Sequence, residues 1–205
     1  MEKLTIYLGS KNKSSWSLRA WLMLLQTATD FEAVFIQLDQ PDTKEKIANI
    51  SPSGKVPVLK HGDQLIWDSL AIGEYLAEVF PNALLWPKEA KSRALARSIS
   101  AEMHAGFQSL RKHLPYNLEA RFPYPDLLEE TEREISRVIQ IWQDCRLKHY
   151  SNGEFLFGSF TIADAMFAPV ITRFITYNVP LPEIVQQYIA SIMALPEMQM
   201  WCNDI

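Results

Sequence analysis

Every clear strand pattern in this chain precedes Asp68, whereas the residues after Pro87 carry only helical patterns, and this division narrows the possible folds. The predicted strands cover residues 4–8, 32–38, 56–60 and 64–67. They are identified by alternating or concentrated apolar, β-branched and aromatic residues. The expected element order is βαβ, then αββα, then helices alone. The fold class is therefore an α/β unit followed by an all-α unit.

These patterns divide the chain into two expected domains. Residues 1–80 form the α/β domain, residues 81–87 have the composition of a linker, and residues 88–205 form the helical domain. The first two strands are expected to pair in parallel because a helix connects them. Pro57 lies in the third strand, where a proline removes a ladder hydrogen bond. It therefore belongs at a sheet edge or in a special geometry such as a cis Val56–Pro57 bond.

The composition excludes several classes of protein. The 205 residues carry a formal net charge of −4 without a basic block, which argues against nucleic acid as the main partner. The two cysteines have no metal-ligand spacing, so neither a disulfide framework nor a metal site is expected, and Cys145 continues an apolar helix face. Because the chain shows no signal-peptide pattern and no apolar run that could span a membrane, we expect a soluble, cytoplasmic protein.

A serine-rich stretch opens the first predicted helix. Ser14, Ser15 and Ser17 fall where a helix leaves backbone N–H groups without partners. An apolar face with the period i, i+3, i+4 and i+7 starts at Leu18. Because a helix N-terminus carries a partial positive charge, this stretch suits an anion such as a thiolate. The alternative is a redundant N-cap, since serine is a preferred capping residue.

Four segments agree in order and spacing with a known family. They are the serine-rich helix start, Lys55-Val56-Pro57-Val58-Leu59, Trp67-Asp68-Ser69-Leu70-Ala71-Ile72-Gly73-Glu74-Tyr75-Leu76, and a capping box formed by Thr161 and Asp164. The first part of the chain resembles the thioredoxin fold, with Pro57 at the position of its cis-proline. The whole chain resembles the cytosolic glutathione transferase family. Its N-terminal domain is accordingly expected to be thioredoxin-like.

The resemblance implies a serine-type enzyme, in which a hydroxyl at the start of the first helix hydrogen-bonds the glutathione sulfur and favours the nucleophilic thiolate. Residues 14–19 are similar to the zeta-class pattern Ser-Ser-Cys-Ser-Trp-Arg. That pattern points to Ser14 as the activating residue and Ser15 as a second contact, and the choice between them stays open here. Trp16 stands where the pattern has cysteine, so the zeta subclass also stays open. Tyr7 is the rival donor, as in tyrosine-type members, or a packed strand aromatic.

The resemblance also implies contacts to the rest of glutathione, the expected co-substrate. Val56 matches the family residue whose backbone pairs with the cysteinyl part, as a short added strand would. Asp68 and Ser69 match the γ-glutamyl contacts, with Ser69 at the carboxylate and Asp68 near the ammonium group. Lys55 could meet the glycyl carboxylate or remain a solvated charge.

The second substrate, an electrophilic small molecule, is expected to bind between the two domains. His104, Phe107 and Arg111 fall at i, i+3 and i+7 of a helix predicted over residues 88–112, so they share one helix face. That face could form a pocket wall for an acidic or polar electrophile, or it could serve packing or dimer contacts. Met103 is expected to be a core residue.

These features predict a serine-type glutathione S-transferase that adds the glutathione thiolate to an electrophile. Homodimerisation is implied by the resemblance alone. A second possibility is a glutathione-dependent cis–trans isomerase of the maleylacetoacetate type. A third is a non-catalytic module with this fold that acts through protein contacts. The presence of Asp68 and Ser69 beside Pro57 favours a working glutathione site, since a contact module has no need of one.

Overall fold

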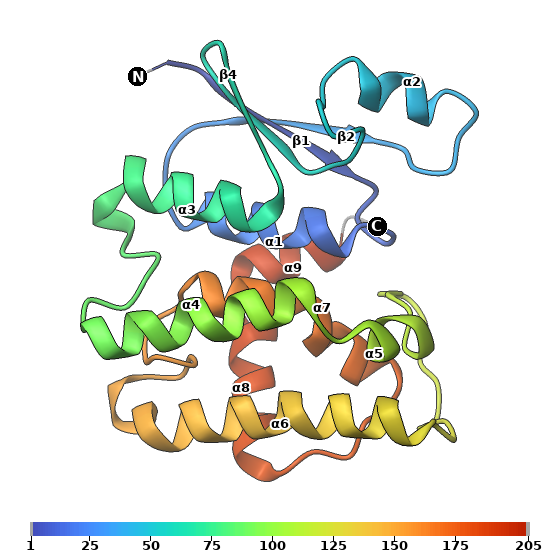
Figure 1. The fold of residues 1–205 in the computed structure, drawn as a ribbon, viewed down its shortest axis with the longest axis vertical. Coiled ribbons are helices and arrows are strands. Elements are labelled where there is room, and N and C mark those ends of the chain that lie inside the picture. Colours follow the sequence, from blue (N-terminus) through green and yellow to red (C-terminus); the bar gives the residue numbers. More distant parts are fainter. Residues whose placement is uncertain (1, 204–205) are drawn as a thin grey trace.

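The computed structural model describes residues 2–203 and shows a four-stranded sheet across one end of a set of helices (Figure 1). The strands are β1 (Leu4–Gly9), β2 (Glu32–Ile36), β3 (Val58–His61) and β4 (Gln64–Trp67). Their order in the sheet is β2-β1-β3-β4. The β1 strand pairs in parallel with β2 and antiparallel with β3, and β3 pairs antiparallel with β4. The helix between β1 and β2 explains their parallel pairing.

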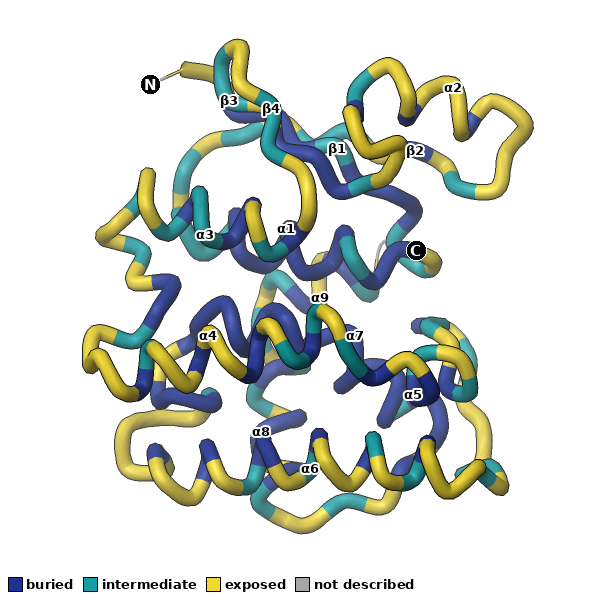
Figure 2. Tube along the Cα trace, in the orientation of Figure 1, coloured by how far each residue is buried: buried dark blue, intermediate teal, exposed yellow. Residues whose placement is uncertain are grey.

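Three helices complete the α/β part, namely α1 (Ser15–Leu25), α2 (Thr43–Ala48) and α3 (Ser69–Val79). Figure 1 shows α1 and α3 between the sheet and the remaining helices, with α2 at the margin. The α1 helix is buried along most of its length, as the dark blue in Figure 2 shows. Its apolar residues face both the sheet and the helical part, as in a helix that is buried all round. The start of α1 therefore lies at the boundary between the two parts.

The helical part surrounds one central helix. Its elements are η1 (Pro81–Ala83), α4 (Ala90–Ala105), α5 (Gln108–His113), α6 (Glu129–His149), η2 (Tyr150–Asn152), α7 (Ile162–Thr176), α8 (Glu183–Met193) and α9 (Pro196–Asn203). Nearly every residue of α7 is buried, and α7 packs against both α1 and α4 (Figure 2). No helix among residues 2–203 is long and apolar enough to cross a membrane.

The predicted fold class and element order are confirmed. The capping box of α7 is present, because Asp164 Oδ2 accepts hydrogen bonds from the N–H of Thr161 at 2.8 Å and from its hydroxyl at 2.9 Å. Met103 and Cys145 are core residues, as predicted. The Val56–Pro57 peptide bond is cis, and β3 begins after it.

The single helix predicted over residues 88–112 is wrong, because the chain leaves the helix at Gly106 and starts a new one at Gln108. Gly106 has an extended backbone, and a Cβ there would lie 2.9 Å from the carbonyl oxygen of Glu102. Phe107 follows with a left-handed backbone, φ 59°. Glycine readily adopts the conformations that end helices. The next proline, Pro115, is the residue from which the sequence predicts the end of the helix, and it lies beyond this break.

The domain boundaries at residues 1–80, 81–87 and 88–205 stay a prediction. One continuous apolar core runs through both parts, from Ile6 in the sheet to Trp201 in the last helix. The two parts therefore share one interior, and residues that meet across it can form a site.

Candidate active site

The start of α1 holds a short chain of hydroxyl hydrogen bonds. The N–H of Gly9 donates to Ser17 Oγ at 2.9 Å, and the hydroxyl of Ser14 donates to the same oxygen at 2.8 Å. The N–H of Ser17 donates back to Ser14 Oγ at 3.2 Å, so Ser14 is the N-cap of α1. Ser15 is buried, but its hydroxyl makes no hydrogen bond to another residue in the described range 2–203. The two candidate serines thus differ in their surroundings.

A cavity of about 430 Å³ opens beside the starts of α1 and α3, a size that suits a small ligand. Its lining residues are Trp16, Ser53, Lys55, Val56, Pro57, Trp67, Asp68, Ser69 and His104. The four predicted glutathione contacts therefore lie together, and His104 joins them from α4. Ser14 and Ser15 do not line the cavity themselves, but they precede Trp16, which does.

The start of α3 presents an unpaired hydroxyl at this cavity. Ser69 is 1% exposed, and its Oγ has no hydrogen-bond partner among the described residues. As the first residue of α3, Ser69 also has a backbone N–H without a partner inside the helix. A buried hydroxyl without a partner costs free energy, and a bound carboxylate would satisfy it.

The carboxylate of Asp68 connects the two parts of the fold at the same place. One oxygen accepts from the N–H of Leu70 at 2.9 Å and from that of Ala71 at 3.4 Å, so Asp68 is the N-cap of α3. The other oxygen lies 3.1 Å from Nε2 of His104. The Nδ1 atom of His104 is buried and has no partner among the described residues. One edge of the cavity is therefore held by a contact between the α/β part and the helical part.

The turn before β3 leaves its backbone open to a ligand. The hydroxyl of Ser51 donates to the carbonyl of Lys55 at 2.6 Å and accepts from its N–H at 3.2 Å, which secures the turn. The N–H and C=O of Val56 make no hydrogen bond within residues 2–203. Unpaired backbone groups beside a cavity can bind an extended peptide as an added strand.

Cationic side chains surround the ring of Trp16. The guanidinium carbon of Arg19 lies 4.3 Å from the ring centroid, and that of Arg111 lies 5.0 Å from it. The imidazole of His104 meets the ring edge-on, with centroids 5.2 Å apart. Trp16 thus lies between the cavity and a group of arginines, of which Arg19 and Arg173 are buried and Arg111 is partly buried.

These three arginines make the surroundings of the site electropositive. Arg19 is fully buried, and its Nε donates to the carbonyl of Met166 at 3.0 Å, while both of its Nη atoms lack partners among the described residues. Burial, and then repulsion by Arg111 and Arg173, lowers the pKa of Arg19 well below its usual value. Burial likewise lowers the pKa of Arg173 to about 10 and lowers that of Arg111. The nearby positive charge favours an anion in the cavity.

The structure separates the three predicted second-substrate residues. His104 lies on the cavity wall, as described above, whereas Phe107 and Arg111 do not line it. Phe107 is buried in the core at 7% exposure. Arg111 is held by the carbonyls of Met103 and Gly106 at the end of α4. The i, i+3, i+7 argument fails here because the helix breaks between His104 and Phe107.

Sequence reasoning missed several wall residues. In the sequence, Trp16 stands out only because it departs from a family pattern. Its position between the serines and Arg19 was a signal that it could line the cavity. Trp67 immediately precedes Asp68 in a recognised motif, and this neighbouring position was the signal that it could line the cavity. Ser53 carried no signal. The rival donor Tyr7 is partly buried within β1 and does not line the cavity. Among residues 2–203, no His, Cys, Asp and Glu side chains gather as they would around a metal ion.

The chain is similar in sequence to glutathione S-transferases and related proteins. A family model described as the glutathione S-transferase N-terminal domain matches residues 13–79. Over 109 residues the chain is 37% identical to a probable maleylacetoacetate isomerase of Caenorhabditis elegans, a match that spans 53% of this chain and 50% of that protein. It is 27% identical to glutathione S-transferase Z1 of Arabidopsis thaliana, over 97% of this chain and 90% of that one.

A solved structure shows the same overall arrangement. It is a Burkholderia glutathione transferase homologue with bound glutathione, which matches this chain with a TM-score of 0.78 and 26% identity. The match covers 100% of both chains. The similarity in fold thus extends over both the sheet and the helical part.

Proposed function

The chain belongs to the cytosolic glutathione S-transferase family, and we propose that it uses the thiol of glutathione to attack an electrophilic small molecule. The observation that carries the proposal is the pairing of two unsatisfied groups at one cavity. These are the buried hydroxyl of Ser69 and the unpaired backbone of Val56. A peptide with a free carboxylate, such as glutathione, would satisfy both.

Each wall residue has a proposed part in binding. The hydroxyl and N–H of Ser69 receive the γ-glutamyl carboxylate at the positive end of α3. Asp68 faces the ammonium group, and Val56 pairs with the cysteinyl backbone. Lys55, which is exposed at the cavity, meets the glycyl carboxylate.

We assign thiol activation to Ser14 because its neighbours can polarise its hydroxyl. In the structure Ser14 donates its proton to Ser17 Oγ, but hydroxyl groups rotate to suit their partners. If both hydroxyls rotate, Ser17 donates a hydrogen bond to Ser14. The hydroxyl hydrogen of Ser14 is then free to form a hydrogen bond with the sulfur of glutathione. The N–H of Gly9 already polarises Ser17, so each bond in this chain strengthens the next. Ser15, whose hydroxyl makes no bond within residues 2–203, is the second candidate.

The helix start supplies the remaining stabilisation of the thiolate. The N-terminus of α1 places a partial positive charge there, and the buried Arg19 and the partly buried Arg111 add positive charge behind Trp16. Bound glutathione supplies the nucleophilic sulfur. The protein's contribution is to stabilise the thiolate form of that sulfur and to orient both reactants.

The second substrate is proposed to lie beside Trp16 and His104. An acidic or polar electrophile suits the positive surroundings of that wall. A glutathione-dependent isomerisation is the alternative, and the similarity to a probable maleylacetoacetate isomerase supports it. Turnover of maleylacetoacetate but not of an activated aryl halide would select the isomerase, and the reverse result would select the transferase.

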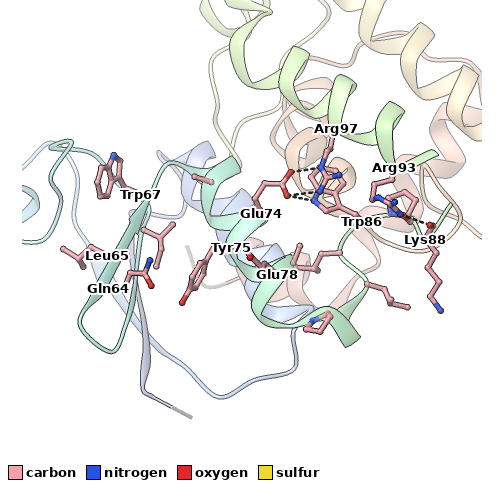
Figure 3. Close-up of a pocket in the computed structure, with 17 residues that line it drawn as sticks. Gln64, Leu65, Trp67, Glu74, Tyr75, Glu78, Trp86, Lys88, Arg93 and Arg97 are labelled. Atoms are coloured by element: carbon pink, nitrogen blue, oxygen red, sulfur yellow. Dashed lines mark hydrogen bonds and ion pairs between the residues drawn. The ribbon is translucent and has the colours of Figure 1, made fainter. Parts of the chain in front are cut away.

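We further propose a cytoplasmic homodimer that uses the outer side of α3. A cavity of about 790 Å³ lies there, between β4, α3 and the segment that enters α4. Figure 3 shows the residues that line it. Glu74 binds Arg97 at 2.9 Å beside it, and Trp67 and Leu84 are 44% and 47% exposed at its wall. Apolar groups with both charge signs on one surface are self-complementary, as a two-fold interface requires. Leu84→Glu should shift the mass measured by light scattering from dimer to monomer.

The first experiment is an ultraviolet difference titration of glutathione into the protein from acid to mildly alkaline pH. A thiolate signal with an apparent pKa below that of free glutathione supports the proposed activation. Binding without such a signal would point to a non-activating site. Absence of binding would overturn the transferase proposal and favour the non-catalytic module.

A further inference from the structure

The loop before Ser14 decides where the activating serine enters α1. The carbonyl of Ser10 accepts from the N–H of Lys13 at 3.1 Å and from that of Ser14 at 2.9 Å. On the sheet side, the hydroxyl of Ser10 accepts from the N–H of Leu38 at 2.9 Å. Any displacement of residues 10–13 therefore moves Ser14.

Two side chains of the helical part meet at one carbonyl of this loop. The hydroxyl of Tyr116 donates to the carbonyl of Lys11 at 3.2 Å, and the indole N–H of Trp201 donates to it at 3.1 Å. The same indole N–H lies 3.1 Å from the hydroxyl oxygen of Tyr116, which closes a triangle. Tyr116 and Trp201 are 105 and 190 residues from Lys11 in the chain. We call this arrangement the Lys11 latch.

The indole of Trp201 lies in the protein interior, so packing restrains the geometry of the latch. Trp201 has no exposed surface, and its ring packs against Trp21 and Phe35 at centroid distances of 5.9 and 6.1 Å. A buried indole N–H needs a partner, and the loop carbonyl provides it. Burial raises the pKa of Tyr116, so its hydroxyl keeps its proton and remains a donor at neutral pH.

Other contacts between the loop and the helical part are weaker. The ammonium group of Lys11 donates to the carbonyl of Met200 at 3.1 Å, and the amide of Asn12 donates to Glu119 at 3.4 Å. Both contacts are exposed, where water competes for each partner. The latch, whose hydrogen bonds are partly buried, is better shielded from water than these two contacts.

We propose that Tyr116 and Trp201 are positioning residues for thiol activation, which hold the Ser14 loop through the carbonyl of Lys11. The inference rests on the proposed function of Ser14. The last helix thereby takes part in building a site whose other residues lie mostly in the first 69 positions. The strength of a hydrogen bond falls steeply with its angle and distance, so a small loop shift weakens the bond from Ser14 to the sulfur.

The test compares Tyr116→Phe, Trp201→Phe and the double variant, which remove the donors but keep aromatic rings. Each has a matched control in the helical part. Tyr177→Phe removes a hydroxyl that donates to the carbonyl of Pro115 at 3.2 Å, next to Tyr116. Trp142→Phe shortens a fully buried indole of α6 whose N–H has no partner among the described residues. Within residues 2–203, neither Tyr177 nor Trp142 makes a hydrogen bond or ring contact to residues 10–13 or to Trp201.

The readout is the pH profile of the thiolate absorbance with saturating glutathione, together with kcat and KM at one pH. In the double variant the apparent pKa of the thiol should rise by about half a unit or more. At a pH below the thiol pKa, kcat of the double variant should be about two- to tenfold lower than kcat of the unmodified protein. This is the range expected for the loss of one hydrogen bond. The controls should change thermal stability without moving the thiol pKa.

Two outcomes would overturn the inference while the proposed function stands. One is a normal thiol pKa in the double variant when the unmodified protein shows a thiolate. The other is an equal shift in the controls. Tyr116→Phe conserves packing and decides the question by itself if Trp201→Phe does not fold. An unmodified protein that binds no glutathione would overturn both proposals at once, which distinguishes that failure from the first two.

Discussion

The hydroxyl of Ser14 lies 2.8 Å from that of Ser17, one turn further along α1, and Ser17 is itself bonded to the N–H of Gly9. The cap of the helix and the candidate activating group are thus one hydrogen-bonded unit. A change at Ser17 can reach the site without altering any residue at the cavity.

Replacing Ser17 by alanine should raise the thiol pKa of bound glutathione by about 0.5 unit, because Ser14 loses the donor that polarises it. Ser14→Ala should raise it by about 1–2 units, the value of a lost charge-assisted hydrogen bond, and should cost about 1 kcal/mol of helix capping. The measurement is the ultraviolet titration described above. Ser98→Ala, at an exposed hydroxyl of α4, is the control.

The same series separates the two candidate serines. If Ser15 is the activating residue instead, Ser15→Ala should give the largest shift, and Ser17→Ala should leave the thiol pKa unchanged. That pattern would contradict the assignment to Ser14.

Ser69→Ala should weaken glutathione binding about tenfold or more while leaving stability nearly unchanged. Its buried hydroxyl has no partner among residues 2–203 to lose, but it is the proposed donor to a carboxylate. Isothermal titration gives the affinity, and thermal unfolding gives the stability. Ser100→Ala is a close control, because Ser100 is also a buried serine whose hydroxyl lacks a described partner, on α4 and not on the cavity wall. Equal affinity losses in both variants would remove Ser69 from the proposed site.

Replacing Arg19 by methionine should raise the thiol pKa by about 0.5–1 unit, because a buried positive charge behind Trp16 is lost. Methionine keeps much of the side-chain volume, so the effect reports charge more than packing. The control is Arg137→Met, which removes an exposed ion pair with Glu102 at 2.7 Å. An unchanged thiol titration in Arg19→Met would show that the buried arginines do not act on the cavity.

The capping residue Asp164 should make stability depend on pH in a defined window. Burial raises its pKa from 3.8 to about 6, despite the opposing hydrogen bonds from Leu156 and Thr161. Because the folded-state pKa is the higher one, this carboxyl favours the folded state below about pH 4. Its contribution to the free energy of unfolding falls by about 3 kcal/mol in total as the pH rises to about 6.

Chemical denaturation of the unmodified protein and of Asp164→Asn isolates the contribution of Asp164 ionisation to the free energy of unfolding. The difference between their free energies of unfolding should shrink from pH 4 to pH 6 and stay level above that range. The Asn variant is expected to be less stable throughout, because Asp164 accepts from Leu156 at one oxygen and from Thr161 at the other, and asparagine replaces one of these two oxygens by an NH2 donor. A difference that is constant over this range would show that Asp164 titrates normally.

The local pattern of the sequence determined the fold to a large extent. Alternation around Ile6, the turn before Pro57 and the motif at Asp68 and Ser69 each predict an element and its cap from neighbouring residues. Those features depend on backbone preferences and on periodicity, which act over a few residues. The serine-rich start of α1 and the wall formed by Lys55, Val56, Asp68 and Ser69 were predictable for the same reason.

Only the tertiary structure decided how the helical part completes this site. The break at Gly106 directs Phe107 into the core and leaves His104 on the cavity wall beside Asp68. The contact of Trp201 with the carbonyl of Lys11 spans almost the whole chain. Neither could be read from spacing, because helix packing and long-range hydrogen bonds depend on which surfaces meet when the core closes. The sequence by itself determined most of the elements and the part of the cavity wall that the α/β part supplies, whereas packing between the two parts decided which side chains share the cavity.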